Sequence, residues 1–536
     1  MHVPVLIVGA GPVGLALAGD LAWRGVETLL VERTSGDIYQ PKMDLVGIRS
    51  MEFCRRWGIA DWVRDSPYPR DYPQDYVYVT SLTGYELGRE VMPSKDDEPI
   101  PPQSPQKRER CPQDMFDPIL RRWVESLGKA DLMLNTTLTE LVEKDDVVAA
   151  TLTDARTGDQ RTVTAEYAIG ADGAGSNVRQ ILGIEMQGRS ALTYTNNAIF
   201  RCPDLVSMHD KGKAYRFIFI GPEGTWGTIV AINGGDRWRF SFVGTSEPRI
   251  MTEDDVRAAI IRAMGKDFDF EILSIVPWVR RELVAESYGR GRVFIVGDAA
   301  HVMSPTGGFG MNTGIQDAVD LGWKLEAMLS GWGGTNLLPS YEIERRPVAQ
   351  RNVQEASGNL TRMLSPRTIA PPVDLLDPGP EADRHRREFG DEYAARMKRE
   401  WYTIGIHLGY HYEGSPIIVS DGTPPPEPEV MTYTPTARPG SRAPHAWLAD
   451  GRSTLDLYGR GYVLLRLGDA PPDATPLAAA AASRGVPLTE QRLHERDVAD
   501  LYGCRLVLVR PDGHVAWRSD HLHDDVGRLI DRVRGM

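Results

Sequence analysis

A glycine-rich turn between two apolar strands, at the start of the chain, constrains the fold more than any other feature. The apolar run Val3–Val8 predicts a strand, and Gly9-Ala10-Gly11-Pro12-Val13-Gly14 follows it directly and opens a helix. A second apolar run, Thr28–Val31, ends at the acidic residue Glu32. This acid follows the last glycine at close to the spacing of about 20 residues found in dinucleotide-binding βαβ units. The pattern therefore predicts such a unit here.

Each part of this turn has a physical role in holding a dinucleotide. Gly9 allows the tight turn, Gly11 lets the backbone approach a pyrophosphate, and Gly14 lets the helix pack on the strand. The N-terminus of the helix offers unpaired N–H groups and partial positive charge to phosphate. Glu32 is expected to accept hydrogen bonds from the ribose hydroxyls, and Arg33 beside it is a further candidate for cofactor contact. The turn alone does not distinguish FAD from NAD.

Length, charge and cysteine spacing narrow the class of protein. A chain of 536 residues predicts two to four domains of about 100–200 residues each. A net charge of −13 argues against nucleic acid as a partner, and no run of about 20 apolar residues could span a membrane. The N-terminus lacks the pattern of a signal peptide, and the four cysteines have no CxxC spacing. We therefore expect a cytoplasmic protein with free thiols and no metal site.

Secondary-structure signals change along the chain and predict four parts. Strand–helix alternation marks a discontinuous α/β part that begins with the dinucleotide turn, and β-rich runs separated by Gly, Pro and Asp mark an antiparallel sheet, to which the resemblance described below assigns the substrate. A mainly helical segment then ends in a proline-rich linker before a small α/β unit. The predicted parts are residues 1–75, 108–185 and 286–365 (cofactor domain), 76–107 and 186–285 (substrate domain), 366–425 (helical segment and linker) and 430–536 (C-terminal domain).

Two later segments carry a family resemblance. The segment 169–179, with Asp172-Gly173, resembles the DG motif of group A flavoprotein monooxygenases, the FAD-dependent aromatic hydroxylases. The segment 297–312, which begins with Gly297-Asp298, resembles their GD motif. With the N-terminal turn, the motifs follow the family order over roughly residues 1–360. The likeness includes phenol hydroxylase, chlorophenol monooxygenases such as 2,4-dichlorophenol 6-monooxygenase, and natural-product aromatic hydroxylases.

The resemblance implies an α/β fold with three domains. These are a Rossmann-like FAD-binding domain, an antiparallel-sheet substrate domain as in p-hydroxybenzoate hydroxylase, and a thioredoxin-like C-terminal domain. The segments 438–444 and 508–518 resemble that last domain. Because it has no CxxC, dithiol chemistry is excluded and a structural or oligomerising role is expected.

The resemblance also assigns contacts with FAD. Asp298 would bond the ribityl chain, and Asp172 would help to hold FAD in a segment that the family also ties to NAD(P)H. Gly308 and Gly310 would let backbone pass the flavin ring, and the helix beginning near Gly310 would direct its N-terminus at the pyrimidine edge. A surface salt bridge remains an alternative for Arg49, and a simple helix start for Gln113. The further candidates are Arg49 (pyrophosphate), Gln113 (ribityl chain), Pro305, Met311 and Asn312.

The implied reaction is hydroxylation of a small phenolic substrate with NADPH or NADH and O2 through a flavin C4a-hydroperoxide, in a site that excludes water. A phenol has a pKa of about 10, so a base would activate it. Asp44, at the offset of the active-site Asp of phenol hydroxylase, is the candidate base, and Arg239 is the second catalytic candidate. Both could instead be surface charges, and His301 is expected to pack near the flavin. The candidate pocket aromatics, for which plain core is the alternative, are Tyr215, Phe217, Trp226, Trp238 and Phe240.

Other functions remain open at this stage. A related scaffold can carry out Baeyer–Villiger oxidation or epoxidation, and a flavin-dependent dehydrogenase or a non-catalytic flavin-binding protein is a further alternative. The resemblance implies a homo-oligomer. The substrate, the position hydroxylated and the choice between NADH and NADPH stay undetermined.

Overall fold

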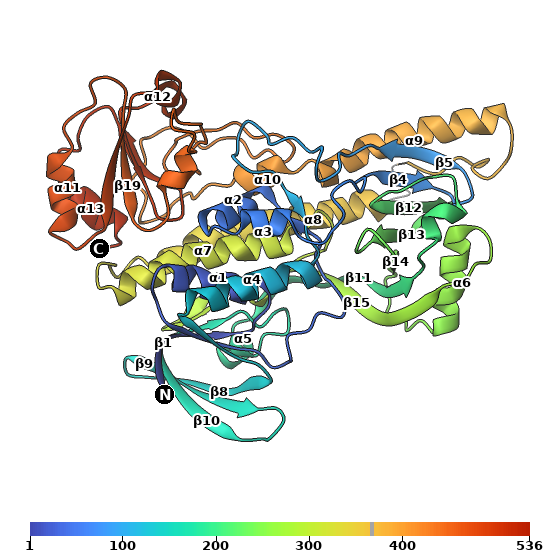
Figure 1. The fold of residues 1–536 in the computed structure, drawn as a ribbon, viewed down its shortest axis with the longest axis horizontal. Helices are drawn as coiled ribbons and strands as arrows, with labels where there is room; N and C mark the ends of the chain where they lie inside the picture. The colour runs from blue at the N-terminus through green and yellow to red at the C-terminus, as the bar shows by residue number, and fades with distance from the viewer. Residues whose placement is uncertain (365–368) are drawn as a thin grey trace.

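The computed structural model of the chain describes residues 1–364 and 369–536, which form three packed parts (Figure 1). The boundary predicted between residues 365 and 366 lies outside the described residues. In Figure 1 the antiparallel sheet lies on the right, the C-terminal domain on the upper left and the N-terminal sheet below. Two long helices, α7 (Gly310–Leu329) and α8 (Pro339–Leu364), run through the middle and connect the parts.

The N-terminal sheet is parallel at its centre. Strand β1 pairs with β2 on one side and with β10 on the other, and its residues from Val5 to Ile7 are fully buried. Such burial on both faces is typical of a parallel sheet covered by helices. An antiparallel pair, β8 (Thr136–Lys144) and β9 (Val147–Asp154), extends it from β10. In spatial order the main strands are β16 (Gly289–Arg290), β17 (Val293–Ile295), β10 (Gln160–Gly170), β1 (His2–Val8), β2 (Thr28–Val31) and β7 (Ala130–Met133).

Helices cover this sheet and carry the predicted motifs. Helix α1 (Pro12–Trp23) follows the glycine turn and packs between α4 (Gln113–Leu127) and α7. A short ribbon of β3 (Leu45–Val46) and β6 (Glu109–Arg110) stands apart from the sheets. The remaining short helices of this region are α2 (Ile48–Arg56), α3 (Ala60–Arg64) and α5 (Asn177–Ile181).

The second sheet is largely antiparallel, and its two faces have different covers. One face packs on α6 (Glu253–Met264), which begins with a capping box at Thr252. The other face packs on α8 and α9 (Pro380–Trp401). In spatial order the strands are β18 (His301–Val302), β15 (Glu271–Ala285), β11 (Met186–Arg201), β14 (Arg237–Phe242), β13 (Gly224–Ala231), β12 (Arg216–Gly221), β4 (Tyr76–Val79) and β5 (Glu86–Glu90).

The C-terminal domain has a four-stranded mixed sheet. Strands β19 and β20 are parallel, whereas β21 and β22 add antiparallel pairs. With the two sheets above, this confirms the predicted α/β fold class and its thioredoxin-like C-terminal domain. The elements are β19 (Tyr462–Leu467), β20 (Leu488–Leu493), β21 (Leu506–Val509), β22 (Val515–Ser519), α11 (Thr475–Ala482), α12 (Arg496–Tyr502) and α13 (Val526–Val533). Within the described part of the chain, no helix combines the length and apolar character needed to cross a membrane.

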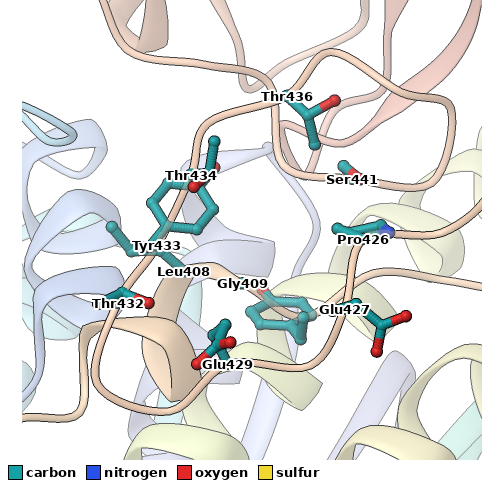
Figure 2. Close-up of a pocket in the computed structure, with 11 residues that line it drawn as sticks. Leu408, Gly409, Pro426, Glu427, Glu429, Thr432, Tyr433, Thr434, Thr436 and Ser441 are labelled. Carbon is teal, nitrogen blue, oxygen red and sulfur yellow. The ribbon is translucent and has the colours of Figure 1, made fainter.

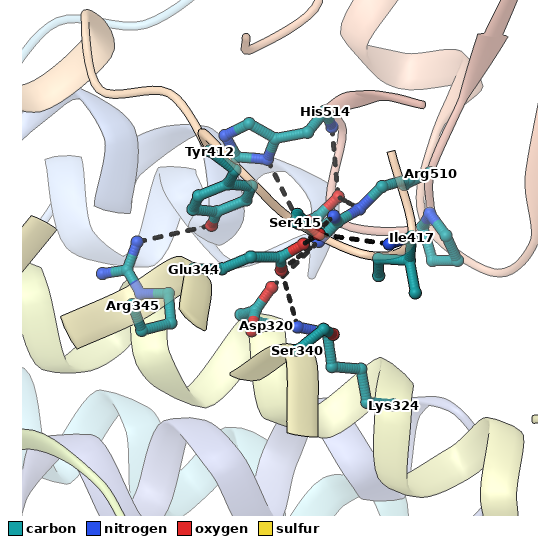
Figure 3. A network of polar contacts seen from close by, with 12 residues as sticks. Asp320, Lys324, Ser340, Glu344, Arg345, Tyr412, Ser415, Ile417, Arg510 and His514 are labelled. Atoms are coloured by element: carbon teal, nitrogen blue, oxygen red, sulfur yellow. Dashed lines mark hydrogen bonds and ion pairs between the residues drawn. The ribbon is translucent and has the colours of Figure 1, made fainter. Parts of the chain in front are cut away.

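A buried ion network joins this domain to α7 and α8 (Figure 3). Arg510 donates to Glu344 at 2.6 and 2.9 Å and to Asp320 at 3.0 Å. Lys324 donates to the same two carboxylates, at 2.6 Å to Glu344 and 2.7 Å to Asp320. All four side chains are 0–1% exposed. The domain is therefore fixed to the central helices by charges that have no access to water.

A second buried ion pair, between Glu52 on α2 and Arg442, holds the same interface. Glu52 also accepts a hydrogen bond from Arg49 at 2.7 Å, and Arg49 donates onward to the carbonyl oxygen of Asp512 at 2.8 Å. Burial alone would raise the pKa of Glu52, but Arg442 and Arg49 outweigh it and lower the pKa from 4.5 to about 2. The carboxylate therefore stays charged in neutral and mildly acidic solution.

Glu52 is expected to make the fold sensitive to acid. A carboxylate whose pKa is lower in the folded chain stabilises that chain above the unfolded pKa, and the contribution disappears as the pH falls through the folded pKa. For Glu52 this window runs from 4.5 down to about 2. As the pH falls through this window, the free energy of unfolding measured by chemical denaturation should decrease less for Glu52→Gln than for the unmodified protein. Equal losses would show that Glu52 does not carry this dependence.

Candidate active site

The glycine turn after β1 has the geometry that a pyrophosphate requires. Gly9 has a φ of +107°, and a Cβ there would lie 2.4 Å from the carbonyl oxygen of Ala171. A Cβ on Gly14 would lie 1.9 Å from the carbonyl oxygen of Gly9, so close packing excludes a side chain. Gly11, which precedes α1, has no atom within 4 Å of the corresponding position. Two glycines thus shape the turn, and the third leaves open space at the helix N-terminus.

Glu32 lies at the end of β2, beside this turn. One carboxylate oxygen accepts from the backbone N–H of Ala10 at 2.9 Å, and the other accepts from Thr34, from the backbone at 3.0 Å and the hydroxyl at 2.8 Å. Arg33 next to it is exposed. The acid is therefore held in a fixed orientation over the turn, where ribose hydroxyls could reach it.

The segment from Asp298 to Gly310, which follows β17, forms another side of the site. The family resemblance predicts the flavin here, and we call this segment the flavin wall. Asp298, in the turn that follows β17, keeps an exposed side chain. Burial raises its pKa, against the opposing charges of His301 and Lys42. Gly307 and Gly308 have φ of +92° and +68°, a conformation that glycine adopts without strain. The backbone can therefore lie flat along this wall with no side chains in the way.

Helix α7 begins at this wall with free backbone N–H groups. No side chain caps its N-terminus, and a Cβ on Gly310 would lie 3.9 Å from Asp298. Asn312 holds the start of the helix, because its side chain accepts from Gly47 at 2.7 Å and donates to Leu45 at 3.1 Å and to Gly308 at 2.9 Å. Pro305 accepts from the N–H of Gly308, and Met311 is half-buried against the core. The uncapped N–H groups favour negative charge at this point.

A cluster of charged and phenolic side chains lies next to this wall. Asp44 accepts from Arg110 at 2.8 Å and from the hydroxyl of Tyr215 at 2.5 Å, and Arg239 lies 3.6 Å away. The guanidinium of Arg110 also covers the Tyr215 ring at 3.6 Å. Asp44 directly precedes Leu45, which Asn312 holds, so the cluster is anchored to the start of α7. Asp44 and Arg239 keep 20% and 21% of their side chains exposed, which leaves room for a ligand.

Electrostatics keep Asp44 ionised and Tyr215 protonated. Burial would raise the pKa of Asp44, but Arg110 and Arg239 outweigh it and hold the pKa below its ordinary value of 3.8. Burial and the charge of Asp44 raise the pKa of Tyr215 well above its ordinary value. The cluster therefore presents an ionised carboxylate that already accepts a hydrogen bond from the phenolic hydroxyl of Tyr215.

Comparison with known proteins identifies the class. The family model of the FAD binding domain matches residues 2–356, and that of the aromatic-ring hydroxylase C-terminal domain matches residues 436–535. The chain belongs to the FAD-dependent aromatic monooxygenases. The rebeccamycin biosynthetic enzyme RebC, solved with reduced flavin, is 41% identical with a TM-score of 0.91, over 100% of this chain and 99% of its own.

Two further relatives cover the whole length of this monooxygenase. The flavin-dependent monooxygenase PieE, solved with FAD and substrate, is 31% identical with a TM-score of 0.88, over 100% of this chain and 99% of its own. The 4-methyl-5-nitrocatechol 5-monooxygenase of Burkholderia sp is 31% identical over 100% of this chain and 98% of its own. The glycine turn, the exposed carboxylate of Asp298 and the uncapped start of α7 are together suited to hold FAD.

Two side chains that were predicted to contact the cofactor of this monooxygenase are held by other protein groups. Arg49 is 1% exposed and is held by Glu52 and the carbonyl oxygen of Asp512, so it serves the domain interface. Asp172 caps α5, where it accepts from the side chain of Ser176 and from the backbone N–H groups of Asn177 and Val178. Both side chains thus have protein partners, and their contacts with FAD stay predictions.

Gln113 and His301 are also engaged by protein groups. Gln113 accepts from the backbone N–H of Lys42 at 3.1 Å and donates to Asp117 at 3.1 Å. His301 is fully buried and lies 2.7 Å from Asp317. Gln113 thus fixes the loop beside the cluster, and His301 belongs to the packing under the flavin wall.

The prediction that four sheet aromatics line the substrate pocket is wrong. Phe217, Trp238 and Phe240 are buried on the face of the second sheet that packs on α6, and Trp226 packs against the same cluster. Successive residues of a strand point to opposite faces, so the neighbours of these aromatics, not the aromatics, face the site. Of the five predicted residues, only Tyr215 reaches the cluster.

A hollow of about 280 Å³ lies between the end of α10 (Ile404–Leu408) and the segment 426–441 (Figure 2). Figure 2 shows the carboxylates of Glu427 and Glu429 beside it. None of the residues predicted for the active site lines it.

Substitution of Gly11 by valine is expected to separate flavin binding from folding. The side chain would enter open space in the protein but would occupy the place of the pyrophosphate. We expect Gly11→Val to fold with a melting temperature near that of the apoprotein and to purify without yellow colour. Flavin absorbance and thermal unfolding measure the two properties. A variant that retains its full content of FAD would show that the pyrophosphate lies elsewhere.

Proposed function

We propose that this monooxygenase hydroxylates a phenolic ring bound at the Asp44 cluster, with NAD(P)H and O2 as co-substrates. The observation that carries the proposal is the contact of Asp44 with Tyr215 and Arg110, held beside the start of α7. When bound, FAD would supply the redox chemistry that activates O2 with electrons from NAD(P)H. The protein residues bind the phenol, orient it and hold its proton.

The charges of the cluster suit a phenol that must become electron-rich. The low pKa of Asp44 makes the carboxylate a hydrogen-bond acceptor and a weak final acceptor for the proton. Arg110 and Arg239 favour the phenolate electrostatically, because nearby positive charge lowers the pKa of an acid. Asp44 and Tyr215 would orient the hydroxyl, while the two arginines stabilise the negative oxygen. This division of roles refines the expectation that Asp44 alone acts as the base.

The test is turnover by the purified holoenzyme. NADH and NADPH oxidation would be followed with and without single-ring and polycyclic phenols, because the relatives include a nitrocatechol monooxygenase and a rebeccamycin biosynthetic enzyme. A hydroxylated product that contains oxygen from ¹⁸O2 supports the proposal. Oxidation of a ketone to an ester would contradict the proposed hydroxylation and indicate Baeyer–Villiger chemistry. Turnover that is independent of oxygen would indicate a dehydrogenase.

A further inference from the structure

Asp117, on α4, is a buried acid that has a single hydrogen-bond partner. The residue is 4% exposed, and its Oδ2 accepts from the amide of Gln113, one helical turn earlier, at 3.1 Å. Its Oδ1 has no partner among the residues that the structure describes. Buried polar groups are normally paired, because an unsatisfied one costs free energy. The stability of α4 alone therefore gives no reason for a carboxyl group at this position.

The protonation of Asp117 shows the same cost. Burial raises its pKa from 3.8 to about 7, against the hydrogen bond from Gln113 and the charge of Arg121, while the charge of Asp114 adds to the rise. An acid whose pKa is higher in the folded chain loses its contribution to stability as the pH rises through that value. The ionised form therefore destabilises the fold above about pH 7. In either form Oδ2 can accept from Gln113, because the proton can reside on Oδ1.

The amide of Gln113 is held on both sides. Its Oε1 accepts from the backbone N–H of Lys42 at 3.1 Å, while its Nε2 donates to Asp117. The backbone N–H of Gln113 also donates to the carbonyl oxygen of Met43 at 3.0 Å. A flipped amide would place donor against donor at Lys42 and oxygen against carboxylate at Asp117. The two contacts together therefore fix which amide atom lies on which side.

Gln113 lies at the corner of the site that adjoins the flavin wall. Lys42, which binds the amide through its backbone, also acts through its charge on the exposed carboxylate of Asp298. A glutamine amide has two N–H donors and two acceptor positions, and the protein contacts use one of each. One N–H of Nε2 thus remains available, and its direction is set because the other N–H is bound to Asp117.

We propose that Asp117 is a positioning residue for FAD, which orients the Gln113 amide so that the available N–H donates to a hydroxyl of the ribityl chain. The family resemblance predicts a contact between Gln113 and the ribityl chain. The role of Asp117 and the direction of the hydrogen bond extend that prediction. Neither depends on which substrate the enzyme takes.

Titration of the full-length apoprotein with FAD, followed by flavin fluorescence, tests this proposal. We expect Asp117→Ala to weaken FAD binding by about 3–10-fold, the range for one hydrogen bond. Asp117→Asn keeps an oxygen acceptor for Gln113 and should bind FAD within about 2-fold of the unmodified protein. Glu125→Ala removes an exposed carboxylate from the same helix and should leave the affinity unchanged.

The stability of the apoprotein separates positioning from packing. Because the ionised acid destabilises the fold above its pKa of about 7, Asp117→Ala should be at least as stable as the unmodified protein at about pH 8. Chemical denaturation measures this difference. FAD affinity should therefore fall while stability does not. If both fall together, Asp117 serves only the packing of α4, and the proposal is overturned.

A double-mutant cycle shows whether Asp117 acts through Gln113. Gln113→Leu alone should weaken FAD binding by about 3–10-fold, and the addition of Asp117→Ala should then weaken it by less than about 2-fold more. An unchanged affinity in Gln113→Leu overturns the proposal even if Asp117→Ala does not fold. Full additivity overturns it as well, because Asp117 would then act on FAD without Gln113.

Discussion

Replacing Asp44 with alanine is expected to lower kcat/KM for hydroxylation by a factor of about 10²–10⁴, with FAD still bound. The change removes the acceptor of both Tyr215 and Arg110, so the phenol loses the group that orients its hydroxyl. NAD(P)H consumption should persist while more hydrogen peroxide is released, because a misplaced ring no longer receives oxygen. Product formation and peroxide release measured together give the coupling ratio.

The controls for this prediction separate charge from shape. Asp71→Ala, at an exposed position, should leave kcat/KM unchanged, and Asp44→Asn tests the charge with little change in volume. Because the arginines hold the pKa of Asp44 below 3.8, its protonation should reduce activity only below about pH 4. An Asp44→Ala enzyme that retains most of its activity would place the phenol elsewhere.

Replacing Glu344 with alanine is expected to reduce the free energy of unfolding by about 3–5 kcal/mol. Glu344 is the acceptor shared by Arg510, Lys324 and the hydroxyl of Ser415, and all three lie out of contact with water. Its removal leaves two buried cations with too few anions. Arg510 and Lys324 lower the pKa of Glu344, against the effect of burial, so the charged form is the one that is lost.

Chemical denaturation of a matched pair checks this value. Glu388→Ala removes a carboxylate from an exposed pair with Arg384 and should change the free energy of unfolding by only about 0–1 kcal/mol. If the two variants unfold alike, the network of Figure 3 does not hold the domain. The flavin content of Glu344→Ala shows whether the loss spreads along α7.

Local patterns predicted the parts of the fold whose residues are adjacent in sequence. Spacing alone predicts the glycine turn, the strand before it and the glycines after Asp298. Backbone geometry leaves few alternatives to glycine at these positions. The thioredoxin-like unit was likewise predicted from segments within one domain. The confirmed fold class thus rests on short-range rules.

The sheet aromatics failed because alternation sets two faces but does not say which face meets the site. Trp238 and Phe240 face α6, whereas Arg239, which was predicted alongside them and lies between them on β14, reaches the Asp44 cluster on the opposite face. Arg49 is held by Glu52, one turn along the same helix, and by the carbonyl oxygen of Asp512, which lies 463 residues later in the sequence, so no local pattern shows that it serves the domain interface. Arg110 carries no local signal, because only the packing of distant segments brings it to Asp44 and Tyr215.

Helix α7 contributes to both the candidate active site and the attachment of the C-terminal domain. Its first turn presents free N–H groups beside Asp298, and its later turns carry Asp320 and Lys324, which hold the C-terminal domain. A fragment that stopped before residue 430 would leave that lysine and its carboxylates without Arg510, facing solvent along an apolar seam. Deletion of the C-terminal domain would therefore destabilise the later turns of α7. Because α7 is one continuous helix, we expect this loss to reach its first turn, beside the predicted FAD site.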